Sequence, residues 1–195
     1  FVESYVLASD SRDWMTGVNT HQVSLEMSGK KEYITRNVLY PEYEKLCPMD
    51  NAVVGKHKPC KPETYRLPWH LKIDNPDYKQ YKTEELDENI NERIQQIEYD
   101  TANAVETDIS NGICLSESEY AVYEFEREAT GFISFRIVCE ETCEFLMIYD
   151  EMLINGVPDP IRIHGLWVNK YVLEPGEYNL VFFEPVSMKY LNVVM

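Results

Sequence analysis

Positive charge is scarce in this chain of 195 residues, because 18 lysines and arginines stand against 34 aspartates and glutamates. The resulting formal net charge of −16 repels phosphate backbones and anionic lipid surfaces. The sequence offers no compensating basic patch. We therefore expect neither nucleic acid nor a membrane surface among its partners.

Long apolar runs are missing as well. No stretch approaches the roughly 18 uncharged apolar residues that a transmembrane helix needs, and the start, Phe1 to Ser4, lacks the basic and apolar regions of a signal peptide. Hydrophobic residues still make up 44% of the chain, enough for one large domain or one domain with an appended segment. Because the chain opens on Phe1 and its last strand-like run stops at Met195, we expect a piece of a longer protein. The sequence leaves the compartment open.

Cysteine is sparse and scattered, at Cys47, Cys60, Cys114, Cys139 and Cys143. An odd number at such spacing excludes a disulfide-built scaffold. A zinc site from Cys47, Cys60 and His57 would need a fourth ligand and tighter spacing, so we expect no metal or cofactor. Cys139 and Cys143 flank a predicted turn and either face each other across it, where they can oxidise, or are free. Free buried cysteine is the commoner case.

Catalytic motifs are absent too. The chain contains no G-x-S-x-G elbow, Walker loop, G-x-G-x-x-G or H-E-x-x-H. Its four histidines lie in dissimilar contexts, and a glycosidase pair of carboxyls is not identifiable by sequence spacing among 34 acids. We therefore name no catalytic residue and keep a self-contained carboxylate-dependent hydrolase as an alternative.

Residues 1–82 are rich in proline and aromatic side chains and show little periodicity. Each X-Pro pair disfavours helix at the residue before the proline. Aromatic side chains are depleted in chains that never bury surface. The composition therefore predicts an irregular, extended segment that packs on the rest of the fold.

Residues 83–100 carry an apolar stripe at helical spacing, formed by Leu86, Ile90, Ile94 and Ile97. Steps of four, four and three residues are typical of a short amphipathic helix. The alternative is a strand over residues 94–99.

Residues 101–195 change to a period of two. Short runs rich in aromatic and β-branched residues are bounded by turn residues, and a further strand is expected within 105–115. With no helix between them, such runs predict an all-β fold of antiparallel strands, a sandwich or a barrel. The runs are 120–126, 131–138, 143–149, 166–173, 177–183 and 188–194.

Several residues are suited to binding a sugar, because an indole ring stacks on the apolar face of a pyranose while polar groups take its hydroxyls. The alternation around Trp167 favours burial in the core over stacking. The run 149–160 also collects oxygen ligands of the kind calcium prefers, but it does not follow the D-x-D-x-D-G register, so a polar loop is favoured. The carbohydrate candidates are Trp14, Trp69, Trp167, Asp150, Asn155 and Asp159.

Four segments then occur in a specific order. YEFEREATGFISFRI at 123–137 is similar to Y-D-x-G-R followed by x-x-x-G, and IYDEMLING at 148–156 to Y-x-E-x-L-x-x-G. YVLEPGE at 171–177 is similar to Y-x-L-x-x-G, and FEPVSMKYLNV at 183–193 to F-x-P-x-x-x-R-Y-I-x-V. Together they resemble the α-L-rhamnosidases, a family of glycoside hydrolases.

The resemblance implies a jelly-roll-like accessory β-sandwich upstream of a catalytic (α/α)6 barrel in the same parent chain. The catalytic acids of the family lie in that barrel, so no catalytic position carries over. Its partners would be that downstream domain and a rhamnose-containing glycan. Glu124 and Glu126 stand where the family usually has Asp and Gly, and Lys189 replaces an Arg. An autonomous carbohydrate-binding module is the other alternative.

Overall fold

The computed structural model describes residues 2–7, 42–66, 89–162 and 165–195. The fold is all-β, as the period-two pattern predicts. All six runs predicted from residue 120 onward are strands, and β4 lies in the further predicted segment. The elements are β1 (Val2–Leu7), β2 (Pro48–Pro59), α1 (Ile90–Gln95), β3 (Ile97–Tyr99), the 3-10 turn η4 (Thr101–Asn103), β4 (Val105–Asp108), β5 (Glu119–Gly131), β6 (Ser134–Cys139), β7 (Cys143–Asp150), β8 (Leu153–Ile154), β9 (Val157–Pro158), β10 (Val168–Leu173), β11 (Gly176–Val181) and β12 (Val186–Val194).

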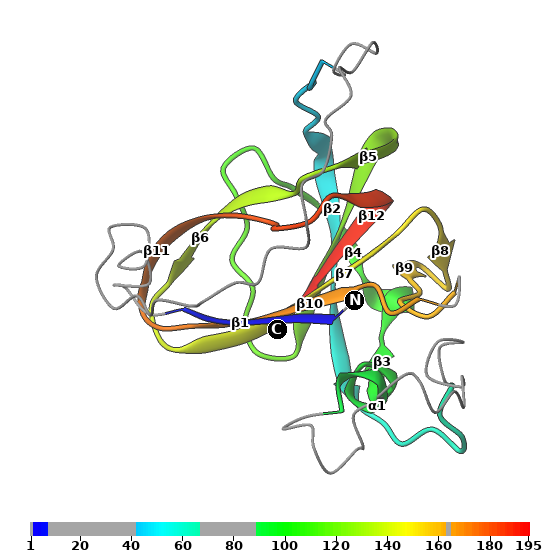
Figure 1. The fold of residues 1–195 in the computed structure, drawn as a ribbon. Helices are drawn as coiled ribbons and strands as arrows, with labels where there is room; N and C mark the ends of the chain where they lie inside the picture. The colour runs from blue at the N-terminus through cyan, green and yellow to red at the C-terminus, as the bar shows by residue number, and fades with distance from the viewer. Residues whose placement is uncertain (1, 8–41, 67–88, 163–164) are drawn as a thin grey trace, which may run out of the picture.

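A large curled sheet forms the centre of the described fold (Figure 1). Its strand order is β1-β10-β7-β12-β5-β2-β3, and β4 also pairs with β2. Every pair among the strands after residue 120 is antiparallel, while β1 joins β10 in parallel. The large sheet therefore combines β1, from the start of the given sequence, with strands from its second half.

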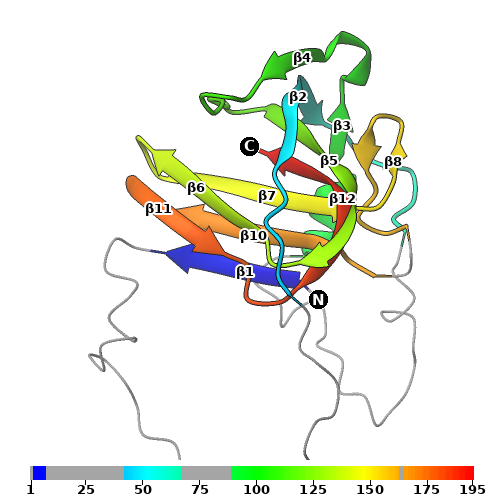
Figure 2. The same cartoon turned by 90° about the horizontal axis from the view of Figure 1, so that it is seen from above.

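A second, two-stranded sheet of β6 and β11 lies over β7 and β10 (Figure 2). Alternate side chains of this small sheet, among them Phe135 and Tyr178, pack against the large sheet. With buried residues such as Phe145 and Tyr171 they form a cluster that we call the first core. Phe135 meets the ring of Tyr171 edge-on at 5.4 Å, and Phe145 stacks on Tyr171 at 5.1 Å. Burial of such aromatic area is what holds the two β layers together.

The opposite face of the large sheet is covered by α1 and the chain before β10. Ile94 of α1 and Ile161 pack there on a second core that includes Leu146 and Ile148 of β7. β7 is thus buried on both faces, which explains why its sequence is nearly continuously apolar rather than alternating.

β2 is a twelve-residue strand inside the segment whose composition predicts irregular, extended chain. Its prolines, Pro48 and Pro59, stand at the two ends, where a strand tolerates them. Between them only Ala52 is buried, so the strand lacks the apolar alternation by which strands are predicted. Pairing with β5 and β4, not local sequence, makes this segment a strand.

The predicted helix is shorter than its apolar stripe. α1 begins after Asn89, whose side-chain oxygen accepts the Glu92 N–H, and Asn89 Nδ2 donates to Glu92 Oε1 at 2.9 Å. The helix ends at Gln95, and β3 pairs with β2, so the strand alternative is right for 97–99. Leu86 lies outside the described residues.

Candidate functional site

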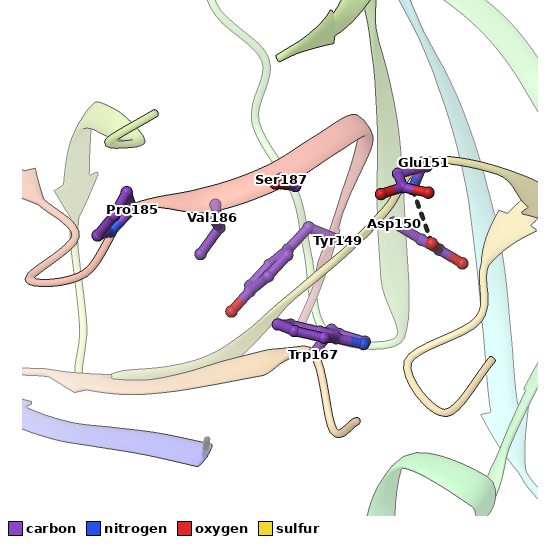
Figure 3. Close-up of a pocket in the computed structure, with 7 residues that line it drawn as sticks. All are labelled: Tyr149, Asp150, Glu151, Trp167, Pro185, Val186 and Ser187. Carbon is purple, nitrogen blue, oxygen red and sulfur yellow. Dashed lines mark hydrogen bonds between the residues drawn. The ribbon is translucent and has the colours of Figure 1, made fainter. Parts of the chain in front are cut away.

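A cavity of about 170 Å³ opens where β7 ends and β12 begins (Figure 3). It is smaller than the roughly 300 Å³ at which pockets for drug-sized ligands begin, so it suits a small ligand. Three segments meet at it, because β10 and β12 both flank β7 in the sheet. The lining residues are Tyr149, Asp150, Glu151, Trp167, Pro185, Val186 and Ser187.

Two aromatic rings form one wall of this cavity (Figure 3). The ring centroids of Tyr149 and Trp167 lie 6.2 Å apart at an interplanar angle of 58°, and Tyr149 also meets Phe182. The indole is closely held, because a Cβ at Gly165 would lie 2.5 Å from a Trp167 ring atom. Trp167 Nε1 is buried and has no hydrogen-bond partner among the described residues. The wall is therefore closely packed and aromatic, with one buried polar group, the indole N–H.

The acidic side of the cavity is occupied by an ion pair. Asp150 is 3% exposed, and Arg162 donates to both of its carboxylate oxygens, Nε to Oδ2 and Nη2 to Oδ1, each at 2.7 Å. The Glu151 N–H donates to Asp150 Oδ1, and Glu151 Oε2 lies 3.3 Å from Arg162 Nη2. The hydrogen bond with Asp150 raises the pKa of Arg162. Asp150 therefore fixes the loop after β7.

Asp159, which is buried, makes a second ion pair, with the more exposed side chain of Arg66. The two guanidinium nitrogens Nη1 and Nη2 donate to its two carboxylate oxygens at 2.7 Å each, and the Ile161 N–H donates at 3.1 Å. Burial alone would raise the pKa of Asp159, but the Arg66 and Ile161 hydrogen bonds outweigh it and lower that pKa. The Arg66 carbonyl accepts from Asn91 of α1. Asp159 directly follows β9. Through Arg66 it therefore connects the end of β9 to the chain after β2 and to α1.

Asn155 lies at the tip of the β8–β9 hairpin. With Gly156 it forms the two-residue loop, and both residues have positive φ, 52° and 87°. This is the pattern of a type I′ turn, for which Asn-Gly is the favoured pair. A Cβ on Gly156 would also lie 3.3 Å from Cγ2 of Thr101. Asn155 therefore has a structural role in the turn.

Of the six carbohydrate candidates, Trp167 and Asp150 line the same cavity. Asn155 and Asp159 do not line it, and Trp14 and Trp69 lie outside the described residues. Tyr149 and Ser187 line the cavity but were not among the candidates. The position of Tyr149 next to Asp150 at the end of an apolar run could have indicated it, whereas Ser187 is brought near only by sheet pairing.

Neither a metal site nor a spanning helix is found in the described part of the chain. Across 2–7, 42–66, 89–162 and 165–195, no three His, Cys, Asp or Glu side chains cluster in a way that could hold a metal ion. In those same ranges no helix has the length and apolar character to cross a bilayer.

No protein-family model matches the chain, and no curated protein matches it. Three solved structures align with part of the chain. An α-L-rhamnosidase from Dictyoglumus thermophilum aligns at 20% identity and a TM-score of 0.34, over 38% of this chain and 9% of that one. A GH78 family rhamnosidase of a Bacillus species aligns at 15% and 0.37, over 47% of this chain and 11% of its own.

The third structure is a rhamnosidase from Klebsiella oxytoca with rhamnose bound, at 14% identity and a TM-score of 0.33. The alignment covers 48% of this chain and 21% of that one. The chain thus spans a small part of each of these proteins. Such partial likeness does not establish the family.

Proposed function

We propose that this chain is a non-catalytic, jelly-roll-like β-sandwich domain of an α-L-rhamnosidase-like glycoside hydrolase. The observation that carries the proposal is the order of the four motifs within residues 123–193. Their residues hold structural positions: Gly131 ends β5, Gly156 forms the type I′ turn and Gly176 begins β11 at a φ of 157°. These structural positions support a scaffold role for the motifs.

Two departures from the motifs support the same proposal. Glu124 and Lys189 replace the usual Asp and Arg, and Lys189 Nζ lies 2.8 Å from Glu124 Oε1 across β5 and β12. An Asp and an Arg at these positions could form the same kind of pair. The two replacements keep the opposite charges that such a pair needs.

The charged groups at the cavity favour a structural role for this site over a catalytic one. An inverting or retaining glycosidase needs one carboxyl that donates a proton and a second that acts as base or nucleophile. Asp150 instead accepts hydrogen bonds from Arg162 and from the Glu151 N–H. Both carboxylate oxygens of Asp150 therefore hold the loop after β7, which favours a structural role for this residue.

A patch at the end of the small sheet, where β6 begins and β11 ends, is the proposed contact for the downstream catalytic domain of the parent chain. Phe132, Val181 and Phe183 are 47%, 64% and 81% exposed, and we call them the outer patch. They adjoin because Val181 pairs with Ser134 and the Phe182 N–H donates to the Ile133 carbonyl. Exposed apolar side chains that gather in this way mark interaction surfaces.

Activity of the isolated chain tests the non-catalytic role. We expect no hydrolysis of an aryl α-L-rhamnoside by the isolated chain, and turnover by the parent protein under the same conditions. Turnover by the isolated chain at a rate near that of the parent would contradict the proposal.

The outer patch is tested in the parent protein. We expect Phe183→Ser to speed proteolytic separation of this domain from its neighbour severalfold. Val105→Ser is the control, because Val105 is 61% exposed on β4 and outside the patch. Equal cleavage of both variants and the wild type would overturn the assignment.

An autonomous carbohydrate-binding module is the second candidate, and the Tyr149–Trp167 wall favours it. Titration with L-rhamnose distinguishes the two. Saturable quenching of tryptophan fluorescence that disappears in Trp167→Phe supports the module. An unchanged signal supports the scaffold.

A further inference from the structure

Two cysteines stand at the corner where the chain passes between the two sheets. Cys139 ends β6 in the small sheet, and Cys143 begins β7 in the large one (Figure 2). β10 and β11 pass the same corner alongside, because Cys139 pairs with Gly176 and Cys143 with Leu173. A bond between the sulfurs would thus join the two β layers.

The two thiols are already in contact. Their Sγ atoms lie 3.0 Å apart, and closing this separation to the roughly 2.05 Å of a disulfide needs a movement of about 1 Å. Cys139 is 7% exposed and belongs to the first core, while Cys143 is half-buried at its edge. One thiol is therefore reachable, and the second is held against it.

We propose that Cys139 and Cys143 form a disulfide site that locks the corner between the two β layers when a small disulfide reagent oxidises it. This inference stands apart from the proposed function, since it rests only on the sulfur contact and the strand topology. The three residues between the cysteines supply the turn that keeps the sulfurs together.

The reaction consists of two exchange steps. The Cys143 thiolate attacks one sulfur of the reagent, whose S–S bond breaks and releases one thiolate, leaving a mixed disulfide on Cys143. Cys139 then loses its proton to solvent and attacks Cys143 Sγ, which forms the protein disulfide and releases the second thiolate. Both released thiolates take protons from water. The cysteines lose two electrons and two protons, and the reagent becomes two thiols.

The environment determines the order of these steps and the choice of reagent. Burial and the contact with Cys143 raise the pKa of Cys139 to about 12, so the more accessible Cys143 reacts first. Glu140 and Glu141 lie exposed on the turn and repel anions. A cationic disulfide such as cystamine is therefore the suitable probe.

The test oxidises the reduced chain with cystamine and maps it by mass. Trypsin releases residues 137–162 as one peptide with both cysteines, since no lysine or arginine lies between Arg136 and Arg162. We expect this peptide to become lighter by about 2 Da, the two hydrogens lost on disulfide formation. Exposed Cys47 and Cys114 are internal controls, and each should keep one cysteamine.

A peptide 137–162 that keeps one cysteamine, or stays reduced while the controls react, would overturn the proposal. The thermal midpoint of the oxidised chain is a second readout. A closed loop is expected to raise it by a few degrees in the wild type and not in Cys143→Ser. An unchanged midpoint in the wild type would show that the bond does not tie the layers.

Discussion

Gly55 shows how much of a residue's role depends on its partner across the sheet. A Cβ at this position would lie 2.7 Å from the hydroxyl oxygen of Tyr120, so the backbone of β2 approaches that ring directly. The turn glycine Gly156 could be predicted from the Asn-Gly pair alone. The role of Gly55 could not, because nothing local places Tyr120 opposite it.

Gly55→Ala is expected to destabilise the fold by about 1–3 kcal/mol, since the added methyl overpacks a closed contact. Urea unfolding at pH 7 measures the change. Gly131→Ala is the matched control, because nothing lies within 4 Å of its added Cβ, and it should change little. Equal effects of the two variants would mean that Tyr120 moves aside.

Asp159 provides a prediction about pH. Its pKa is lowered in the folded state, so the ion pair with Arg66 stabilises the fold above the unfolded pKa near 3.9, and this stabilisation is lost as pH falls through the lower, folded pKa. Asp159→Asn should cost about 1–3 kcal/mol at pH 7 and clearly less below pH 3.

Urea unfolding at both pH values measures this difference. Glu177→Gln removes an exposed partner of Arg136 instead and should have a small effect throughout. A cost of Asp159→Asn that does not change between the two pH values would show that packing, not charge, is responsible.

At the scale of elements, periodicity predicted those strands whose side chains alternate between core and solvent. β6, β11 and the part of β5 after Val122 are of this kind, and even doubly buried β7 was recognisable by its β-branched and aromatic residues. β2 was not, because one buried alanine leaves no pattern. The apolar stripe from Ile90 to Ile97 extends past the end of α1. Ile90 and Ile94 belong to the helix, whereas Ile97 is the first residue of β3.

The β8–β9 hairpin depends on the backbone conformation of its turn. Asn155→Val should destabilise the fold by about 1–2 kcal/mol, because a β-branched residue disfavours positive φ. Asn155→Gly should be nearly neutral, since glycine adopts this region freely. Thermal unfolding of both variants checks the prediction, and a loss in Asn155→Gly equal to that in Asn155→Val would point to the side chain instead.

At the scale of the molecule, the all-β class followed from the sequence but the cavity did not. Trp167 and Asp150 were named within one set of six candidates, and only the adjacency of β7, β10 and β12 shows that these two line one cavity with Ser187. Strand order is a long-range property, since pairs such as β1 with β10 join residues far apart in sequence. Periodicity contains no information about it.

The net charge of −16 predicts a response to salt. Self-repulsion among the acids is screened as the Debye length falls from about 30 Å to about 8 Å between 0.01 M and 0.15 M ionic strength. We expect the thermal midpoint to rise by a few degrees over this range. A fall would mean that the local ion pairs outweigh the net repulsion.

The position of β12 has a consequence for how the protein is made. This strand comes after the other described strands in the sequence, yet it lies between β7 and β5 in the large sheet (Figure 1). During translation the β10–β7 half and the β5–β2 half have no strand to join them until β12 leaves the ribosome. The nascent chain therefore exposes two open sheet edges until β12 has been made, a stage at which chaperone binding would have the most effect.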